Sequence, residues 1–220
     1  MIPAARRLAT PLALVGAALL LMAATPEQEA YRRARPRTGF TLGGTFGLNL
    51  CLADGGGCDR VGPGAGVEVE LGYRLSAAVA LSVDLGYGAL SPSEAPPFGE
   101  REGSTTAVMA TVRGFVPIGD VVELLLGAGL GYSQLTLSSD ATRDELRWHT
   151  FFALKLLAGV SLRLDERADL GLVVTTYVNP PGGELCTTEP GWDSERCGTF
   201  GGTDIPEHVL VGVRAAYRFY

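Results

Sequence analysis

The chain has 220 residues, of which 46% are apolar and 19% charged, and its formal net charge is −6. This length predicts a single domain, and the apolar content excludes a disordered chain. The acidic balance excludes a general nucleic-acid binder, which would be basic. Thirty glycines without a Gly-X-Y period exclude a collagen.

Residues 1–24 have the composition of a secretory signal peptide. Arg6 and Arg7 precede a short apolar run that ends in small residues near Ala24. The run is shorter than the roughly 20 residues that a membrane-spanning helix needs, so an uncleaved anchor is the weaker alternative. Residues 25–37 form a basic tail with four arginines, which we expect to be solvated on the periplasmic side. Attraction to anionic headgroups or cell-wall polymer is the alternative.

Residues 38–220 alternate between apolar and polar side chains with a period of two, which predicts strands. One face of each predicted strand carries no charged side chain. Connections are short after the second, fourth and sixth strands and long after the first, third, fifth and seventh. This asymmetry is typical of an up-and-down β-barrel in an outer membrane. The eight predicted strands cover residues 40–50, 67–75, 79–87, 108–116, 122–132, 148–164, 170–178 and 209–219.

Two features favour an apolar face that points outward into lipid. A secreted soluble ligand-binding barrel would instead enclose its apolar face. Strand glycines gather on the polar face, where they make room for long side chains in a narrow lumen. Aromatic residues fall near the two ends of the strands, as expected at two membrane interfaces. They are Phe40, Tyr73, Tyr217 and Phe219 at the short-turn end, and Tyr87, Tyr132 and Trp148 at the long-loop end.

The last stretch, residues 209–220, alternates to its end and finishes in Tyr217, Phe219 and Tyr220. Here the chain resembles the bacterial outer-membrane β-barrel family, and in particular the small eight-stranded barrels of the OmpA, OmpX and OmpW type. The resemblance implies an all-β, antiparallel, eight-stranded transmembrane barrel over residues 38–220, surrounded by outer-membrane lipids. It also implies insertion by the barrel-assembly machinery, which reads a terminal aromatic. Tyr220 shifts that aromatic by one residue from the usual pattern.

Four cysteines occur as two local pairs, Cys51 with Cys58 and Cys186 with Cys197. An even number of cysteines in an exported chain predicts disulfides. Spacing alone allows three connectivities, and we favour the local pairs because each closes a short loop. A zinc site is the alternative, but the close Cys-x-x-Cys spacing of such sites is missing.

The four long loops carry thirteen acidic residues and only four arginines, a net charge of −9. We interpret them as a solvated surface, and attraction of cations or of a basic extracellular partner is the alternative. No Asp-x-Asp-x-Asp-Gly calcium loop is present in the sequence. The acidic residues are Asp54, Asp59, Glu94, Glu100, Glu102, Asp140, Asp144, Glu145, Glu184, Glu189, Asp193, Glu195 and Asp204.

The polar face of the predicted strands holds four acids and six bases, which must pair inside a barrel. An eight-stranded barrel is just wide enough for side chains to fill it, so we expect a plugged lumen. A narrow ion path is the alternative. The ten residues of this predicted charge network are Glu68, Glu70, Arg74, Asp84, Arg113, Glu123, Lys155, Arg163, Arg214 and Arg218.

His149, Tyr177 and His208 are expected to project inward at one height near the long-loop end. We interpret this mouth cluster as polar lining, with a metal or acid–base site as the alternative, because no serine or carboxylate supports catalysis at a fixed spacing. The sequence therefore predicts no enzyme, no cofactor and no metal. It predicts a monomer with a structural or surface-interaction role; a narrow channel for small or apolar solutes is the second hypothesis, and a lipid-modifying enzyme the third.

Overall fold

The computed structural model describes residues 38–52, 58, 61–92, 102–118, 121–138, 145–180, 183–188, 196–199 and 207–219. Within these residues no helix is long and apolar enough to cross a membrane. The predicted signal peptide, the basic tail and Tyr220 lie outside the described residues. Eight long strands are present: β1 (Gly39–Leu52), β3 (Gly64–Arg74), β4 (Val79–Pro92), β5 (Glu102–Ile118), β6 (Val122–Ser138), β7 (Glu145–Arg163), β8 (Ala168–Val178) and β11 (Glu207–Phe219).

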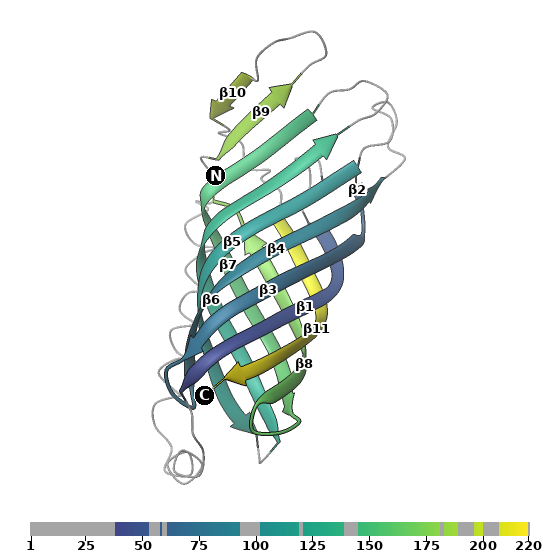
Figure 1. Cartoon of the computed structure of the whole chain (residues 1–220). Coiled ribbons are helices and arrows are strands. Elements are labelled where there is room, and N and C mark those ends of the chain that lie inside the picture. The colour runs from purple at the N-terminus through teal and green to yellow at the C-terminus, as the bar shows by residue number, and fades with distance from the viewer. Residues whose placement is uncertain are drawn as a thin grey trace, which may run out of the picture.

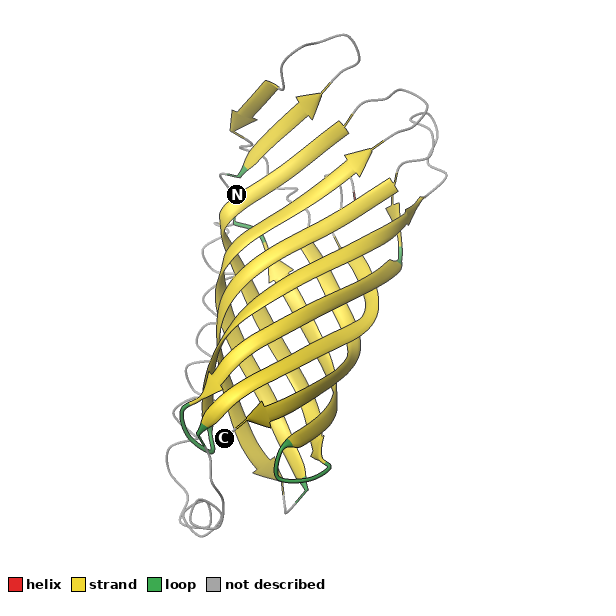
Figure 2. Ribbon diagram, in the orientation of Figure 1, coloured by secondary structure: helices red, strands yellow, loops and turns green. Residues whose placement is uncertain are grey.

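These eight strands form one closed antiparallel barrel, as the sequence predicts (Figures 1 and 2). Each strand pairs with the next along the chain, and β11 closes the barrel by pairing with both β8 and β1. Phe40 pairs with Phe219, so the chain enters and leaves the barrel at the same end. The short turns lie at that end too, where the backbone N–H of Leu75 and the backbone N–H of Leu164 each bond across a turn.

The apolar faces of the strands point outward and the charged faces point inward. Leu48, Leu85 and Leu172 are exposed on the outside, whereas the side chains of Arg113 and Lys155 are 0% exposed inside. An isolated barrel with this surface would leave a broad apolar band in water, which soluble monomers avoid. The arrangement excludes the soluble barrel with an apolar interior.

A β-bulge interrupts the alternation of β7. Gly131 of β6 pairs with Ala153, but Ser133 pairs with Thr150, so Phe151 and Phe152 together oppose Tyr132. Both phenylalanines are exposed, at 69% and 76%. A bulge adds one residue to one strand, and every residue beyond it changes face.

The bulge overturns two sequence predictions. Trp148 was expected outside and instead packs against the buried cluster of Leu135 and Leu137. His149 was expected inside, but it lies on the outer face, where its ring is near those of Tyr132 and Phe151. A strict alternation extended from residues 154–164 does not count the extra residue of the bulge, so it assigns the residues before the bulge to the wrong face.

Three short strands extend the sheet beyond the barrel at the long-loop end: β2 (Val61–Gly62), β9 (Glu184–Thr188) and β10 (Arg196–Thr199). β8 pairs with β7 only as far as Leu154, and β9 takes over as the partner of β7 between Glu145 and His149. β10 then pairs with β9. The ends of β6 and β7 beyond the bulge, together with β9 and β10, form a sheet above the barrel (Figure 1). We call this sheet the extension.

Candidate functional site

The centre of the lumen holds an ionic network around Asp84 of β4. Its carboxylate accepts hydrogen bonds from Thr111 Oγ1 at 2.6 Å, from Arg113 Nη2 at 2.8 Å and from Lys155 Nζ at 2.6 Å. Thr111 and Arg113 lie on β5, which pairs with β4, and Lys155 lies on β7, which does not. Because Asp84 and Lys155 belong to strands that are not neighbours, this contact bridges the lumen.

Two glutamates of β3 extend the network. Glu68 accepts the hydroxyl hydrogen of Tyr177 and lies 2.7 Å from Lys155 Nζ. Glu70 accepts bonds from Arg214 Nε at 3.0 Å and Nη2 at 2.8 Å, and it also contacts Arg113. Three carboxylates therefore face three cations, and the centre of the lumen carries no net formal charge. Buried ions need this pairing, because each unpaired charge would cost several kcal/mol.

A second ionic group lies near the short turns. Glu123 pairs with Arg163 and, at 3.4 Å, with Arg74 Nη2. Arg218 Nη2 lies 3.0 Å from Asp169. The network predicted from the sequence omits Asp169. Its position directly before the outward-facing Leu170 nevertheless places it on the inner face. All ten predicted network residues face the lumen, and Asp169 joins them.

Apolar layers separate the ionic groups, which the sequence reading did not anticipate. One buried cluster lies between the two networks, and a second lies at the long-loop end. The first consists of Ala80, Phe115, Leu125, Leu157 and Val173. The second consists of Val61, Leu90, Leu135 and Leu137, with Cys51, Leu146 and Trp148 packed against it. The guanidinium of Arg74 stacks over the ring of Phe115 at 3.9 Å, which joins the first cluster to the lower ionic group.

The predicted mouth cluster is brought together only in part. The rings of Tyr177 and His208 stack inside the barrel, with centroids 4.3 Å apart and planes 14° apart. His149 lies on the opposite side of the barrel wall. The cavity beside Tyr177 and His208 has a volume of about 10 Å³, too little for a substrate.

A glycine shapes the lumen just above this pair. Asn49 Nδ2 donates a hydrogen bond to Thr105 Oγ1 at 2.9 Å. A Cβ atom at Gly88 would lie 2.1 Å from that Nδ2, so no larger residue fits while Asn49 stays in place. This close approach explains one of the inward glycines that the sequence places on the polar face.

Outside the barrel, the chemistry of the wall changes at the level of the bulge. Below it, the outer face carries exposed apolar residues such as Val108 and Leu130. Above it, the outer face is polar, and Tyr132 bonds to Gln134, which donates to Thr136 Oγ1 at 2.9 Å. A sheet with polar residues on its outer face and apolar residues on its inner face is typical of an aqueous environment, so the outer face of the extension is suited to contact with water.

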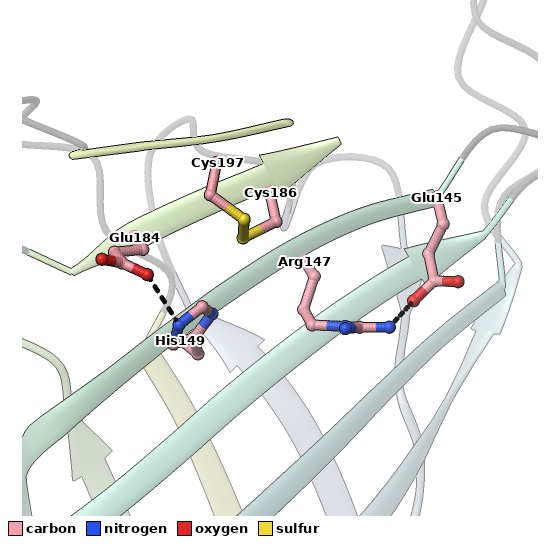
Figure 3. The surroundings of a disulfide bond; sticks show 6 residues. All are labelled: Glu145, Arg147, His149, Glu184, Cys186 and Cys197. Atoms are coloured by element: carbon pink, nitrogen blue, oxygen red, sulfur yellow. Dashed lines mark hydrogen bonds and ion pairs between the residues drawn. A yellow bond between two sulfur atoms is a disulfide. The ribbon is translucent and has the colours of Figure 1, made fainter. Parts of the chain in front are cut away.

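Both local disulfides favoured from the sequence are present, Cys51–Cys58 and Cys186–Cys197. The second staples β9 to β10 on the outer face of the extension (Figure 3). Beside it, His149 Nε2 lies 3.2 Å from Glu184 Oε2. Among the described residues, His149, Glu184 and Cys186 are the one group of three or more potential metal ligands whose donor atoms gather, all within 4.8 Å.

The remaining predicted residues fall at the two ends of the molecule. Tyr217 and Phe219, expected to carry the assembly signal, lie on the outer face with ring centroids 4.9 Å apart. Of the acidic loop residues, Glu102, Glu145 and Glu184 are described, and the others lie outside the described residues. Glu145 pairs with Arg147 at 2.7 Å on the exposed face of the extension.

Comparisons with known proteins agree with this geometry. The solved structure of Neisserial surface protein A (NspA) is similar at a TM-score of 0.54 and 15% identity, covering 84% of this chain and 100% of that one. The outer membrane protein OprG from Pseudomonas aeruginosa is similar at a TM-score of 0.52 and 12% identity, covering 84% and 99%. At these identities the likeness concerns the fold alone. No curated protein sequence matches the chain.

A family model gives the assignment that the structures cannot. The model of the outer membrane protein beta-barrel domain matches residues 15–182, well over half of the chain. The closed antiparallel barrel, its apolar outer band and its paired ionic interior fit that match. The chain belongs to the family of outer membrane proteins with a β-barrel domain.

Proposed function

We propose that this protein is a sealed outer-membrane barrel whose role is structural or interactive, and which presents the extension and its loops at the cell surface. One observation carries the proposal: the Asp84–Lys155 contact bridges the lumen inside a network of balanced charge. A solute would have to break several buried ion pairs to pass. The apolar cluster around Leu135 and Leu137 adds a second barrier at the long-loop end.

The same geometry supports the orientation and location. Residues 1–24 would direct export, and short turns face the periplasm in this family of barrels. The extension would then project from the outer leaflet, with Phe151 and Phe152 at the interface, where aromatic residues gather. A basic or cationic partner is the class that acidic loops would attract. We assign no catalytic role to Tyr177 and His208, because among the described residues the cavity beside them has a volume of only about 10 Å³.

The test is conductance of the purified barrel in planar bilayers. We expect no stable single-channel currents from the folded wild type. Folding is checked independently by the difference in gel mobility between boiled and unboiled samples. Stable unitary currents from the folded wild type would contradict the proposal and favour the narrow channel.

A further inference from the structure

The cysteines of the extension lie in an arrangement that a disulfide alone does not require. Cys186 pairs directly with Cys197 across β9 and β10, with Cα atoms 4.1 Å apart. On its other side, β9 pairs with β7, which sets Glu184 opposite His149 and Cys186 opposite Arg147. Directly paired residues share a face of a sheet, so these side chains all lie on the outer face (Figure 3).

The donor atoms of this face already approach the geometry of a metal site. His149 Nε2 and Glu184 Oε2 are 3.2 Å apart, and Cys186 Sγ completes a group within 4.8 Å. Ligands bound to one zinc ion at about 2.0–2.3 Å lie roughly 3–4 Å from one another. Small side-chain rotations would therefore bring the three atoms to bonding distance, and the fixed β7–β9 register holds their backbones in place.

We propose that reduction of the Cys186–Cys197 disulfide creates a site for a divalent cation of the zinc type, with His149, Glu184 and the two thiolates as ligands. Nitrogen, carboxylate oxygen and thiolate sulfur are the donors that zinc takes in tetrahedral sites. The disulfide withholds both sulfurs from a metal. The inference does not depend on whether the lumen conducts.

The chemistry balances with an external thiol as the reductant. Two equivalents of thiol are oxidised to their disulfide, and the Cys186–Cys197 bond takes up the two electrons and two protons to give two protein thiols. Zinc binding then releases the two thiol protons to solvent and forms two sulfur–zinc bonds. Arg147 lies opposite Cys186, and a neighbouring cation favours the thiolate that binds metal.

Access fits this sequence of events. Cys197 lies on β10, whose residues are all exposed, so a small thiol can reach its sulfur. Cys186, on β9, is buried, and its sulfur lies near the His149 and Glu184 side chains. The other disulfide has no such surroundings among the described residues, because no further cluster of three potential ligands is found there.

The experiment uses the full barrel in detergent, in a Cys51→Ser/Cys58→Ser background that leaves one disulfide. The protein is reduced, freed of reductant without oxygen, and titrated with Zn²⁺ against a chromogenic chelator and with Co²⁺ by visible absorption. We expect one equivalent bound, with the strong absorption of tetrahedral cobalt–thiolate coordination. Oxidised protein should bind none.

Variants separate this site from general metal binding. Since even outer-shell changes weaken metal affinity by 10–100-fold, His149→Ala or Glu184→Gln should weaken binding at least about tenfold. Glu102→Gln, an exposed acid on β5, should have no effect. Gel mobility of unboiled samples checks that every variant is folded. Absence of binding by the reduced protein, or binding indifferent to His149→Ala, would overturn the proposal.

Discussion

Lys155 shows at the residue scale how the lumen is held together. It is the single lysine of the chain, and its ammonium lies 2.6 Å from Asp84 and 2.7 Å from Glu68. A single cation therefore neutralises two carboxylates on different strands. Its own pairs are intact only while β3, β4 and β7 keep their places in the closed barrel.

Removing this cation should be costly. Lys155→Met leaves two buried carboxylates short of a partner, and breaking a buried pair typically costs about 3–5 kcal/mol of unfolding free energy. Urea unfolding from lipid bilayers measures the loss. As a control, Glu145→Gln breaks the exposed pair with Arg147 and should cost less than about 1 kcal/mol. Equal effects from the two variants would show that the buried network does not stabilise the barrel.

The turn between β7 and β8 shows how a short element fixes its own ends. The backbone N–H groups of Arg167 and Ala168 each donate to Asp165 Oδ1 at 2.6 Å. These bonds, that from Arg167 first, lower the pKa of the Asp165 carboxyl below its ordinary value. The turn is therefore tightest when this carboxylate is ionised.

The pH dependence follows from this lowered pKa. The contribution of Asp165 to stability is complete above the ordinary aspartate pKa of about 3.9, and it is lost as the pH falls through the lower folded pKa. Carboxyl NMR of the labelled barrel should show Asp165 titrating below the ordinary value. Asp165→Asn should remove the corresponding part of the pH dependence. A normal or raised pKa would show that the turn does not bind the ionised form.

The bulge of β7 is the element that separates the lipid-facing wall from the extension. Deleting Phe152 would remove the extra residue, so Phe151 alone would oppose Tyr132 and residues 145–150 would keep their present faces. Deleting both Phe151 and Phe152 would shift residues 145–150 by one more position, so their side chains would exchange faces and Trp148 would turn outward. In a Trp192→Phe background, Trp148 is the only tryptophan of the chain. We expect the double deletion to raise the quenching of Trp148 by acrylamide, while the deletion of Phe152 alone should not. Equal quenching in the two variants would contradict this role of the bulge.

At the scale of the whole molecule, the described part of the hairpin of β9 and β10 pairs with the barrel through the upper end of β7. We therefore expect Cys186→Ser/Cys197→Ser to leave the barrel folded, with its normal gel mobility difference. Closing a loop of this length contributes about 3 kcal/mol in the chain-entropy model, and that loss should fall on the hairpin. Limited proteolysis should then cleave the hairpin faster. Loss of the folded barrel would show that the two parts form one cooperative unit.

The sequence by itself determined the eight strands, the outward apolar face and the inward ions from Glu68 to Arg218, because a period of two records which side of a strand meets lipid. Register inside each alternating run is fixed by that burial. The same alternation places Asp169 on the inner face, whereas its pairing with Arg218 follows only from the closed barrel.

Only the tertiary structure decided what depends on neighbouring strands. The bulge at Phe151 and Phe152 lies between the stretch of β7 that pairs with β8 and the stretch that pairs with β9. No local sequence pattern marks that change of partner, so the faces that the alternation predicts for Trp148 and His149 are wrong. Which carboxylate meets which cation, and that His149, Glu184 and Cys186 gather beside Cys197, likewise follow from pairings between segments far apart in the chain.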